Sequence, residues 1–202
     1  MDSSLFRVAV RLVAVVGMLS SIVAIATSAT AAPVTDEDRF TLAVFPHDTP
    51  AVSFWDSWGA PRSGGRSHRG TDILSPRGTE VLAVADGVVA DFGTHRMSGH
   101  YIRLDHGGGW STTYMHLNND TIGTDDGEGG IWAAFNPTLT IGAEVTAGDV
   151  IGYVGDSGNA EGTQPHTHFE IKIDGEKINP YPFLEDVFER EQRTMQEIPR
   201  LS

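Results

Sequence analysis

The stretch P-H-T-H-F-E-I-K-I, from Pro165 to Ile173, alternates between polar and apolar side chains. Successive side chains on a β-strand point to opposite faces, so this period of two predicts a half-buried strand. The apolar face, which would belong to the core, carries Thr167, Phe169, Ile171 and Ile173, and the wet face carries His166, His168, Glu170 and Lys172. Two imidazoles side by side on an open face can meet one metal ion or one substrate.

Short segments of similar character, punctuated by glycine, occupy much of the chain. Residues 81–93 are expected to form two strands around a turn at Asp86-Gly87, and further strands are expected at 100–106, 110–117 and 149–155. This pattern predicts an all-β fold, a compact sandwich or barrel-like hybrid of antiparallel strands. Apolar residues at helical spacing after Phe183 predict a short C-terminal helix.

Two further clusters contain histidine. H-R-G-T-D holds His68 and Asp72, and its glycine and β-branched threonine favour a strand edge or loop over a helix. T-Y-M-H-L holds Tyr114 and His116, which are expected to share one strand face. Imidazole and carboxylate groups are suitable zinc ligands, although neither cluster is specific by itself. The remaining histidines are expected to have surface or packing roles, because no spacing ties them to these clusters: His47, His95, His100 and His106.

Several ordered motifs together resemble the lysostaphin-like peptidoglycan metallopeptidases, a family also known by its duplicated hybrid motif. They are W-G-A-P-R-S-G-G-R-S-H-R-G-T-D-I at 58–73, G-T-E-V-L-A-V-A-D-G-V-V at 78–89, the Tyr-x-His at 114–116, and G-D-V-I-G-Y-V-G-D-S-G-N-A-E-G-T-Q-P-H-T-H-F-E at 148–170. The resemblance covers residues 54–182. It implies a zinc endopeptidase that cleaves peptide bonds in stem peptides or cross-bridges of peptidoglycan.

The resemblance also assigns roles to particular residues. Carried over position by position, it makes His68, Asp72 and His168 the Zn²⁺ ligands, and His116 and His166 the catalytic histidines that do not hold the metal. Three protein ligands leave a coordination position open, which is typical of catalytic rather than structural zinc. The alternative is a catalytically silent module of the same fold that binds the cell wall or activates another hydrolase.

The N-terminus predicts export. Arg7 and Arg11 precede an apolar run, and small residues follow up to Ala32, which together are typical of a signal peptide cleaved after Ala31. An uncleaved membrane anchor is the competing interpretation. Either form places the rest of the chain outside the cytoplasm, as a secreted or cell-envelope protein. We expect a signal peptide at 1–31, an N-terminal extension at 32–52, the metallopeptidase domain at 53–182 and a C-terminal helix and tail at 183–202.

The amino-acid composition of the chain restricts the classes of partner that it can bind. The formal net charge of −13 argues against nucleic acid and anionic lipid, which bind basic surfaces. The chain contains no cysteine, so a core, aided by a metal, must hold the fold. We expect a monomer that binds peptidoglycan peptides and meets a membrane only if the N-terminal segment is retained. The long acidic segment at 118–141 departs from the family pattern and is expected to wall the groove, with Trp132 and Phe135 as its apolar anchor.

Overall fold

A computed structural model describes residues 40–197 of the chain. The expected signal peptide and the first residues of the expected N-terminal extension lie outside the described residues. The strands are β1 (Pro61–Arg62), β2 (Arg66–Ser67), β3 (Thr71–Leu74), β4 (Glu80–Leu82), β5 (Gly87–His95), β6 (Gly99–Asp105), β7 (Trp110–Leu117), β8 (Glu144–Val145), β9 (Val150–Tyr153), β10 (His166–Ile173) and β11 (Glu176–Ile178). The helices are α2 (Gly130–Ala134) and α3 (Tyr181–Glu197), with 3₁₀ turns η1 (Ser63–Gly65) and η2 (Gly158–Ala160).

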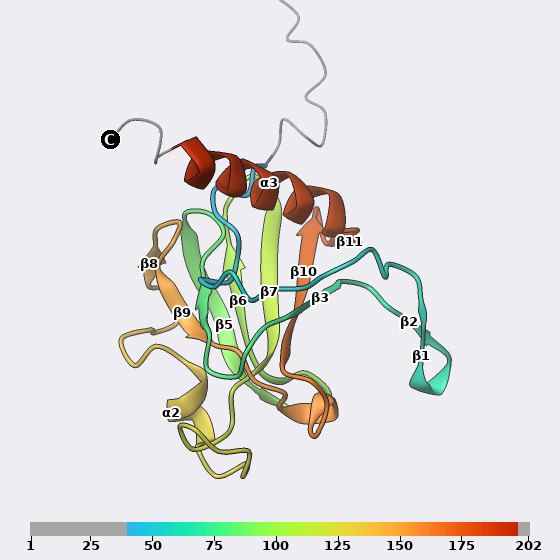
Figure 1. The fold of residues 1–202 in the computed structure, drawn as a ribbon, viewed down its shortest axis with the longest axis vertical. Coiled ribbons are helices and arrows are strands. Elements are labelled where there is room, and N and C mark those ends of the chain that lie inside the picture. The colour runs from blue at the N-terminus through green and yellow to red at the C-terminus, as the bar shows by residue number, and fades with distance from the viewer. Residues whose placement is uncertain (1–39, 198–202) are drawn as a thin grey trace, which may run out of the picture. The chain divides into compact units, whose positions relative to one another are not determined.

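One large antiparallel sheet runs through the described part of the chain in the order β11-β10-β7-β6-β5-β8, and β3 also pairs with β10 (Figure 1). A second, two-stranded sheet joins β4 and β9, and a third forms the β1–β2 hairpin, which stands away from the large sheet. The all-β prediction with a C-terminal helix is therefore confirmed. The helix begins at Tyr181, two residues earlier than the sequence pattern indicated.

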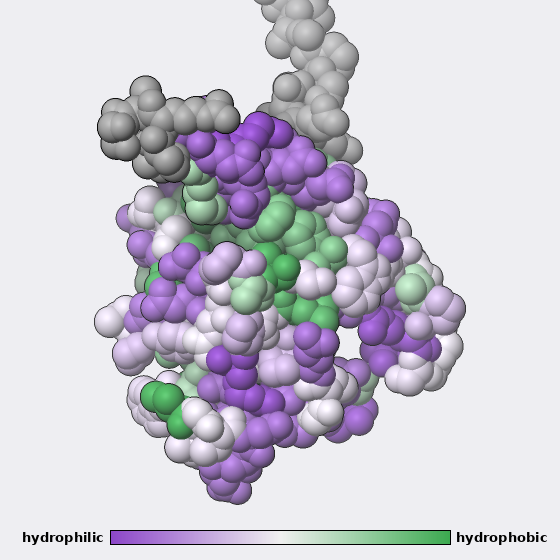
Figure 2. Space-filling view, viewed as in Figure 1, coloured by the Kyte–Doolittle hydropathy of each residue, from purple (hydrophilic) through white to green (hydrophobic). Residues whose placement is uncertain are grey.

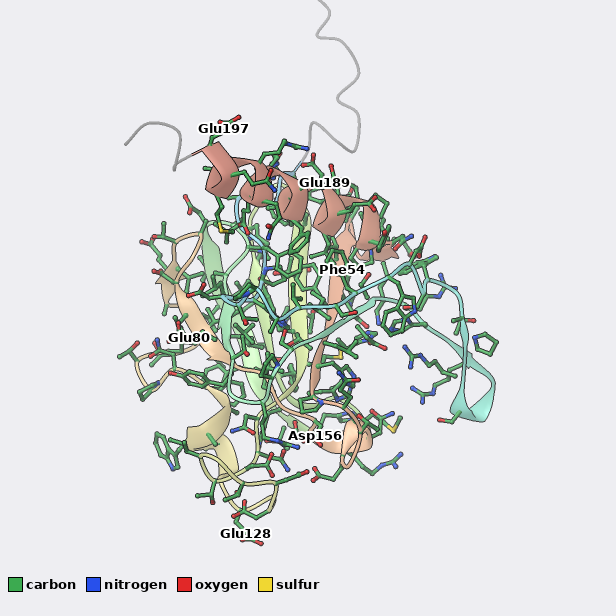
Figure 3. All side chains as sticks on the ribbon, viewed as in Figure 1. Phe54, Glu80, Glu128, Asp156, Glu189 and Glu197 are labelled. Atoms are coloured by element: carbon green, nitrogen blue, oxygen red, sulfur yellow. The ribbon has the colours of Figure 1, made fainter. Side chains whose placement is uncertain are left out.

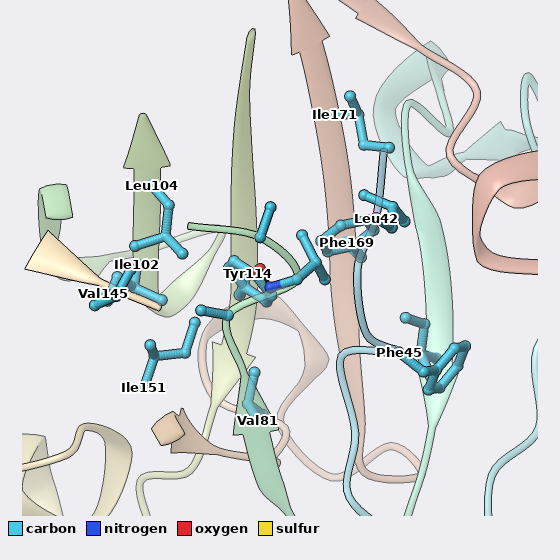
Figure 4. Packing of buried hydrophobic residues seen from close by; sticks show 14 of the residues in the cluster. Leu42, Phe45, Val81, Ile102, Leu104, Tyr114, Val145, Ile151, Phe169 and Ile171 are labelled. Atoms are coloured by element: carbon cyan, nitrogen blue, oxygen red, sulfur yellow. Dashed lines mark hydrogen bonds between the residues drawn. The ribbon is translucent and has the colours of Figure 1, made fainter. Parts of the chain in front are cut away.

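The core lies between the large sheet and the β4–β9 pair. Side chains from both sheets meet there, and Figure 4 shows their packing; the fully buried residues include Val81, Ile102, Leu104, Tyr114, Ile151, Phe169 and Ile171. The apolar face predicted for 166–173 is confirmed, since Thr167, Phe169, Ile171 and Ile173 are all buried. Burying such a side chain contributes roughly 1.5–3 kcal/mol, so β10 anchors the sheet through this face.

The prediction of a hairpin at 81–93 is wrong in its pairing. Two strands do flank Asp86, but β4 pairs with β9, whereas β5 pairs with β6 and β8. Asp86 instead accepts a hydrogen bond from the backbone N–H of Ala147, which belongs to the turn before β9. The two strands thus enter different sheets, so local turn chemistry did not decide their partners.

Helix α3 covers one edge of the core. Leu184 and Val187 are fully buried, and its other face is hydrophilic (Figure 2). The helix also binds the segment that precedes β1: the backbone N–H of Phe45 donates to Glu191 Oε1 at 2.7 Å, and Arg190 donates to the carbonyl oxygen of Leu42 at 2.6 Å. Within the described residues, no helix is long and apolar enough to span a membrane.

A cluster of charged side chains holds the start of the long segment at 118–141 in place. The Arg77 guanidinium pairs with Asp120, Asp125 and Asp156, and the Asp120 and Asp156 carboxylates are fully buried. Further along the segment, the buried Phe135 ring packs against Phe92 with 5.1 Å between ring centroids. The expected role of Phe135 as an apolar anchor matches this packing, whereas Trp132 is 77% exposed.

Tyr114 ties the large sheet to the segment that follows β4. Its hydroxyl oxygen is completely buried and accepts a hydrogen bond of 3.0 Å from the backbone N–H of Val84. We predict that Tyr114→Phe lowers the free energy of unfolding by about 1–3 kcal/mol, because it leaves a buried donor without a partner. Urea denaturation of the variant provides the measurement. The matched change Tyr181→Phe, at a hydroxyl on the exposed surface of α3, should have an effect within about 0.5 kcal/mol. Equal effects of the two substitutions would contradict the assignment.

Candidate metal centre and active site

The register of three neighbouring strands builds the site. β10 lies between β3 and β7, and His168 is directly opposite Asp72 on one side and Met115 on the other. Residues paired directly across a sheet share a face. The strand predicted at 166–173 therefore presents its polar face to a cavity of about 460 Å³, lined by the wet-face residues His166, His168 and Glu170.

Three predicted ligands meet in this cavity. His68 Nε2, Asp72 Oδ1 and His168 Nδ1 form a triangle with sides of 3.0, 2.8 and 2.9 Å. The motif at 68–72 is a loop leading into β3, as its composition favoured, and not a helix. All three side chains are largely shielded from solvent, with 2–16% of each exposed.

Hydrogen bonds alone cannot satisfy this triangle. The two ring nitrogens can supply at most two protons to three contacts, and the ionised carboxylate supplies none. If both ring nitrogens donate to Asp72, the N–H groups of the two rings face each other. If one ring nitrogen donates to the other ring, the lone pair of the accepting nitrogen faces a lone pair of the Asp72 oxygen. A cation that accepts a lone pair from each atom removes this conflict, and the N, N, O donor set suits zinc.

The outer nitrogens of both imidazoles have partners that set the ring orientation. His68 Nδ1 donates to the carbonyl oxygen of Ser57 at 3.1 Å, which leaves Nε2 with its lone pair. His168 Nε2 donates to Glu170 Oε1 at 3.2 Å, which leaves Nδ1 free in the same way. A carboxylate or carbonyl behind each histidine is the usual support of a metal-binding imidazole. Lys177 pairs with Glu170 and holds that carboxylate in place.

The electrostatics of the triangle favour a positive charge. Burial alone would raise the pKa of the Asp72 carboxyl, but hydrogen bonds from His168 and His68 hold it well below its usual range. Burial alone would lower the pKa of His168, but hydrogen bonds to Asp72 and Glu170 raise it. Protons and metal ions compete for such groups, so both shifts indicate a place where one cation is stable. Arg62 pairs with the second oxygen of Asp72 from outside.

His116 and His166 lie beside the triangle without joining it. Their ring centroids are 5.2 Å apart, and the His116 ring is 6.2 Å from the His168 ring. His116 Nδ1 donates to the carbonyl oxygen of Ser157 at 2.8 Å, and His166 Nδ1 donates to that of Gln164 at 2.8 Å. Because a carbonyl only accepts, each ring carries its proton on Nδ1 and keeps a basic Nε2. Burial lowers the pKa of His116 to about 4, so this ring is neutral at pH 7.

The prediction that Tyr114 and His116 share a face is wrong. Tyr114 lies in the core, and His116 lines the cavity together with Met115. The pairing of β6 with β7 shifts register between His100 and Ile102, and His116 has a φ of 60°. Such a β-bulge re-aims a side chain, and the left-handed backbone of a non-glycine residue costs on the order of 1–3 kcal/mol. Strain of this kind gathers at functional sites.

Glycine at position 70 has a role that the sequence did not reveal. A Cβ atom there would lie 2.6 Å from His168 Nε2 and 2.6 Å from the carbonyl oxygen of Phe169. The loop before β3 can therefore approach β10 closely only with glycine at this position. Sequence reasoning also missed Ser57, Arg62, Ser157 and Lys177 as supporting residues. Ser57, Arg62 and Ser157 act through partners at least 10 residues away, and Lys177 acts through Glu170 on the neighbouring strand, so no spacing within a motif marks them.

The long segment at 118–141 does not wall this cavity, since none of its residues lines it. The walls come from the β1–β2 hairpin, from residues 97–98 and from residues 159–163. The segment instead borders a separate cavity of about 750 Å³ with Trp132 and Tyr153 in its lining. That larger cavity lacks the histidine and carboxylate set, so the chemistry belongs to the smaller one. Asn119 of the segment donates to Glu161 at 3.0 Å, beside the residues 159–163 that line the cavity.

The other histidines have packing or surface positions, as expected. His100 is buried, and its Nδ1 shares a hydrogen bond with Thr94 Oγ1. His106 stacks on Trp110 with 4.0 Å between ring centroids. His95 is exposed. His47 is buried beneath β10, where its ring bridges Ser75 Oγ at 2.5 Å and Thr167 Oγ1 at 2.9 Å. It therefore supports from the core side the strand that carries His166 and His168.

Comparison with known proteins places this arrangement in context. The sequence profile of peptidase family M23 matches residues 66–180. The DD-carboxypeptidase/endopeptidase Mpg of Neisseria meningitidis serogroup B is 35% identical over 115 residues, which are 57% of this chain and 22% of the relative. The peptidoglycan DD-endopeptidase ShyC of Vibrio cholerae is 31% identical over 115 residues, with the same coverage. This chain thus spans about a fifth of the length of the curated relatives it matches.

Solved structures show the same fold. The catalytic domain of the antimicrobial peptidase lysostaphin from Staphylococcus simulans superimposes with a TM-score of 0.53 at 26% sequence identity. The superposition covers 66% of this chain and 92% of that domain. The similarity therefore includes nearly the whole of the compared domain.

Burial lowers the pKa of His47 to about 3, with a smaller effect from the nearby His166, and this predicts a pH-dependent stability. Because the folded pKa lies below the unfolded value of about 6.5, stability that is present above pH 6.5 is lost as the pH falls. We expect the advantage of the wild type over His47→Gln, in free energy of unfolding, to shrink by about 2 kcal/mol between pH 7 and pH 5. Urea denaturation at both pH values measures it, and a difference that is independent of pH would refute the assignment.

Proposed function

The chain belongs to peptidase family M23, and we propose that it is a zinc-dependent endopeptidase that hydrolyses peptide bonds in bacterial peptidoglycan. The observation that carries the proposal is the triangle of His68, Asp72 and His168 beside two further histidines, His116 and His166, in one cavity. The relative named as a peptidoglycan DD-endopeptidase supports the choice of substrate. The substrate lies outside the cytoplasm, so we also propose that the domain acts in the cell envelope or outside the cell.

His68 Nε2, Asp72 Oδ1 and His168 Nδ1 would hold the metal. When bound, zinc supplies Lewis acidity, which lowers the pKa of water and polarises a carbonyl. The chain's own contribution is orientation: Ser57 and Glu170 fix the two rings, Arg62 holds the outer oxygen of Asp72, and Gly70 allows the close approach of the loop to β10. Two imidazoles and one carboxylate also fill only part of a tetrahedral shell, which leaves room for water and substrate.

His116 and His166 would move protons. Each ring donates from Nδ1 to a backbone carbonyl, which places the lone pair of the neutral ring on Nε2, where it can accept a proton from the attacking water. Once protonated, the same nitrogen can donate to the developing oxyanion or to the leaving amine. His116 is the more rigid of the two, because it is buried, held by Ser157 and fixed in a strained backbone conformation.

A catalytically silent cell-wall-binding module is the alternative. Such a module needs neither basic histidines nor a strained residue that aims one of them into the cavity. The presence of all five residues in one cavity favours the enzyme. Release of soluble peptides from purified peptidoglycan, detected by mass spectrometry, separates the two functions, since a silent module releases none.

We predict that the protein binds one zinc ion per chain and that a chelator removes both zinc and hydrolysis. Zinc added back restores hydrolysis, because the three ligands are pre-positioned by the sheet. Metal analysis by mass spectrometry and a peptidoglycan digestion assay measure the two effects. Full hydrolysis in a zinc-free, chelated sample would disprove the metal requirement.

Substitution of single histidines distinguishes ligands from proton carriers. We expect His168→Ala to lose zinc and activity, and to unfold at a lower temperature, since a cation bound by the native state alone stabilises it. We expect His166→Ala and His116→Ala to retain zinc but to lose turnover by about a hundredfold or more. The exposed His95→Ala serves as the matched control and should keep both properties. If His166→Ala strips zinc as completely as His168→Ala, the division of roles is wrong.

A further inference from the structure

The charge of the cavity is opposite to that of the chain. Four basic side chains line it, from Arg62, Arg66, Arg69 and Lys177, against two carboxylates, from Asp72 and Glu170. The chain as a whole carries a formal net charge of −13. A cleft lined by one sign of charge concentrates ligands of the other sign. The positive cavity of an acidic protein therefore indicates an anionic ligand.

Two of the four basic side chains already form ion pairs with carboxylates of the site. Arg62 pairs with Asp72, and Lys177 pairs with Glu170. Asp72 belongs to the triangle itself, and Glu170 lies behind the His168 imidazole, so the two pairs hold the proposed metal ligands in place. They account for both acidic groups of the cavity, and no carboxylate of the lining is left for the remaining arginines.

Arg66 and Arg69 form no ion pair with a carboxylate within residues 40–197. Arg66 Nε donates to the carbonyl oxygen of Ser63 at 3.1 Å, and its Nη2 donates to Ser63 Oγ at 3.3 Å. The Arg69 guanidinium lies over the Trp58 ring, 5.4 Å from the ring centroid. Neutral partners thus orient both groups and leave their charge uncompensated, and a stacked guanidinium keeps its edge N–H groups available to a ligand.

Their position fixes where an anion would bind. Arg66 and Arg69 flank His68 in sequence, and both face the cavity from the β1–β2 hairpin and the loop that follows it. Figure 3 shows nitrogen-ended side chains in the space between this hairpin and β10. The lining residues that come from 97–98 and 159–163 are uncharged: Met97, Ser98, Asn159, Ala160 and Thr163. An anionic group would therefore lie on the hairpin side, next to the triangle.

We propose that Arg66 and Arg69 form a subsite for a free carboxylate of the peptide substrate, beside the bond that is cut. The inference rests on the proposed peptidase function and narrows it to acidic peptides. Guanidinium groups bind carboxylates through two parallel hydrogen bonds, and that geometry gives selectivity over the uncharged carboxamide.

The test compares two forms of one ligand. Cross-linked muropeptides are used as isolated and after conversion of their carboxylates to carboxamides. Calorimetry measures the binding of each to zinc-loaded His116→Ala protein, which should bind without turning the ligand over. A hydrogen bond to a charged group is worth about 1.5–3 kcal/mol, so we expect the carboxylate form to bind about tenfold to a hundredfold more tightly.

Arginine variants in the same background locate the effect. Arg66→Gln and Arg69→Gln should each reduce the preference for the carboxylate form, and the double variant should abolish it. Arg193→Gln removes an equally charged side chain from the exposed surface of α3 and should leave the preference unchanged. Zinc content and circular dichroism identify any variant that has lost its fold. If a variant has lost its fold, the His116→Ala protein with both arginines present still provides a test. Equal binding of the carboxylate and carboxamide forms to it overturns the proposal.

The remaining outcomes separate this inference from the function on which it rests. A preference that persists in the folded double variant shows that the carboxylate binds elsewhere, for example at the metal, and overturns the subsite. If the wild type hydrolyses both forms equally well, the subsite is wrong and the peptidase function stands. If the arginine-dependent preference appears but the wild type hydrolyses neither form, the subsite stands as a binding site and the peptidase function is wrong.

Discussion

The antiparallel pairing of β10 with β3 and β7 is the constraint on which the site depends. It places Asp72 directly across from His168, and it sets Met115 on the far side in the same row. A slip of one residue would turn every histidine of β10 into the core and every isoleucine into the cavity. The buried face of β10, with Phe169 and Ile171 fully enclosed, prevents that slip. Hydrophobic burial on one side of the strand thus fixes the ligand geometry on the other.

Much of this could be predicted from the sequence, because the decisive signals are local. The alternation at 166–173 separates core from cavity without any knowledge of the partner strands. The motif at 68–72 contains too much glycine and β-branched threonine for a helix, and it leads into a strand. Five residues of the expected types at the expected intervals then identify the family, and the structure brings all five to one cavity.

The wrong predictions and the overlooked residues share a physical cause, since they depend on contacts between distant segments. Alternation places Tyr114 and His116 on one face, but a register shift opposite β6 separates them. Turn residues at Asp86-Gly87 suggest a hairpin, yet the two strands find better partners in different sheets. The supports of the site are equally non-local: Ser157, whose carbonyl oxygen accepts from His116, lies 41 residues away in the sequence.

The segment at 118–141 is held at its start by the pairing of Asp120 and Asp125 with Arg77, and near its end by the packing of Phe135 on Phe92. Residues 126–134 contribute no strand to the large sheet. The entropy of closing such a loop rises slowly, by about 0.6 kcal/mol for each doubling of its length. Extra residues can therefore be gained or lost there at small cost to folding. This part of the molecule can change in evolution and acquire new surface contacts, while the geometry of the His68, Asp72 and His168 triangle stays the same.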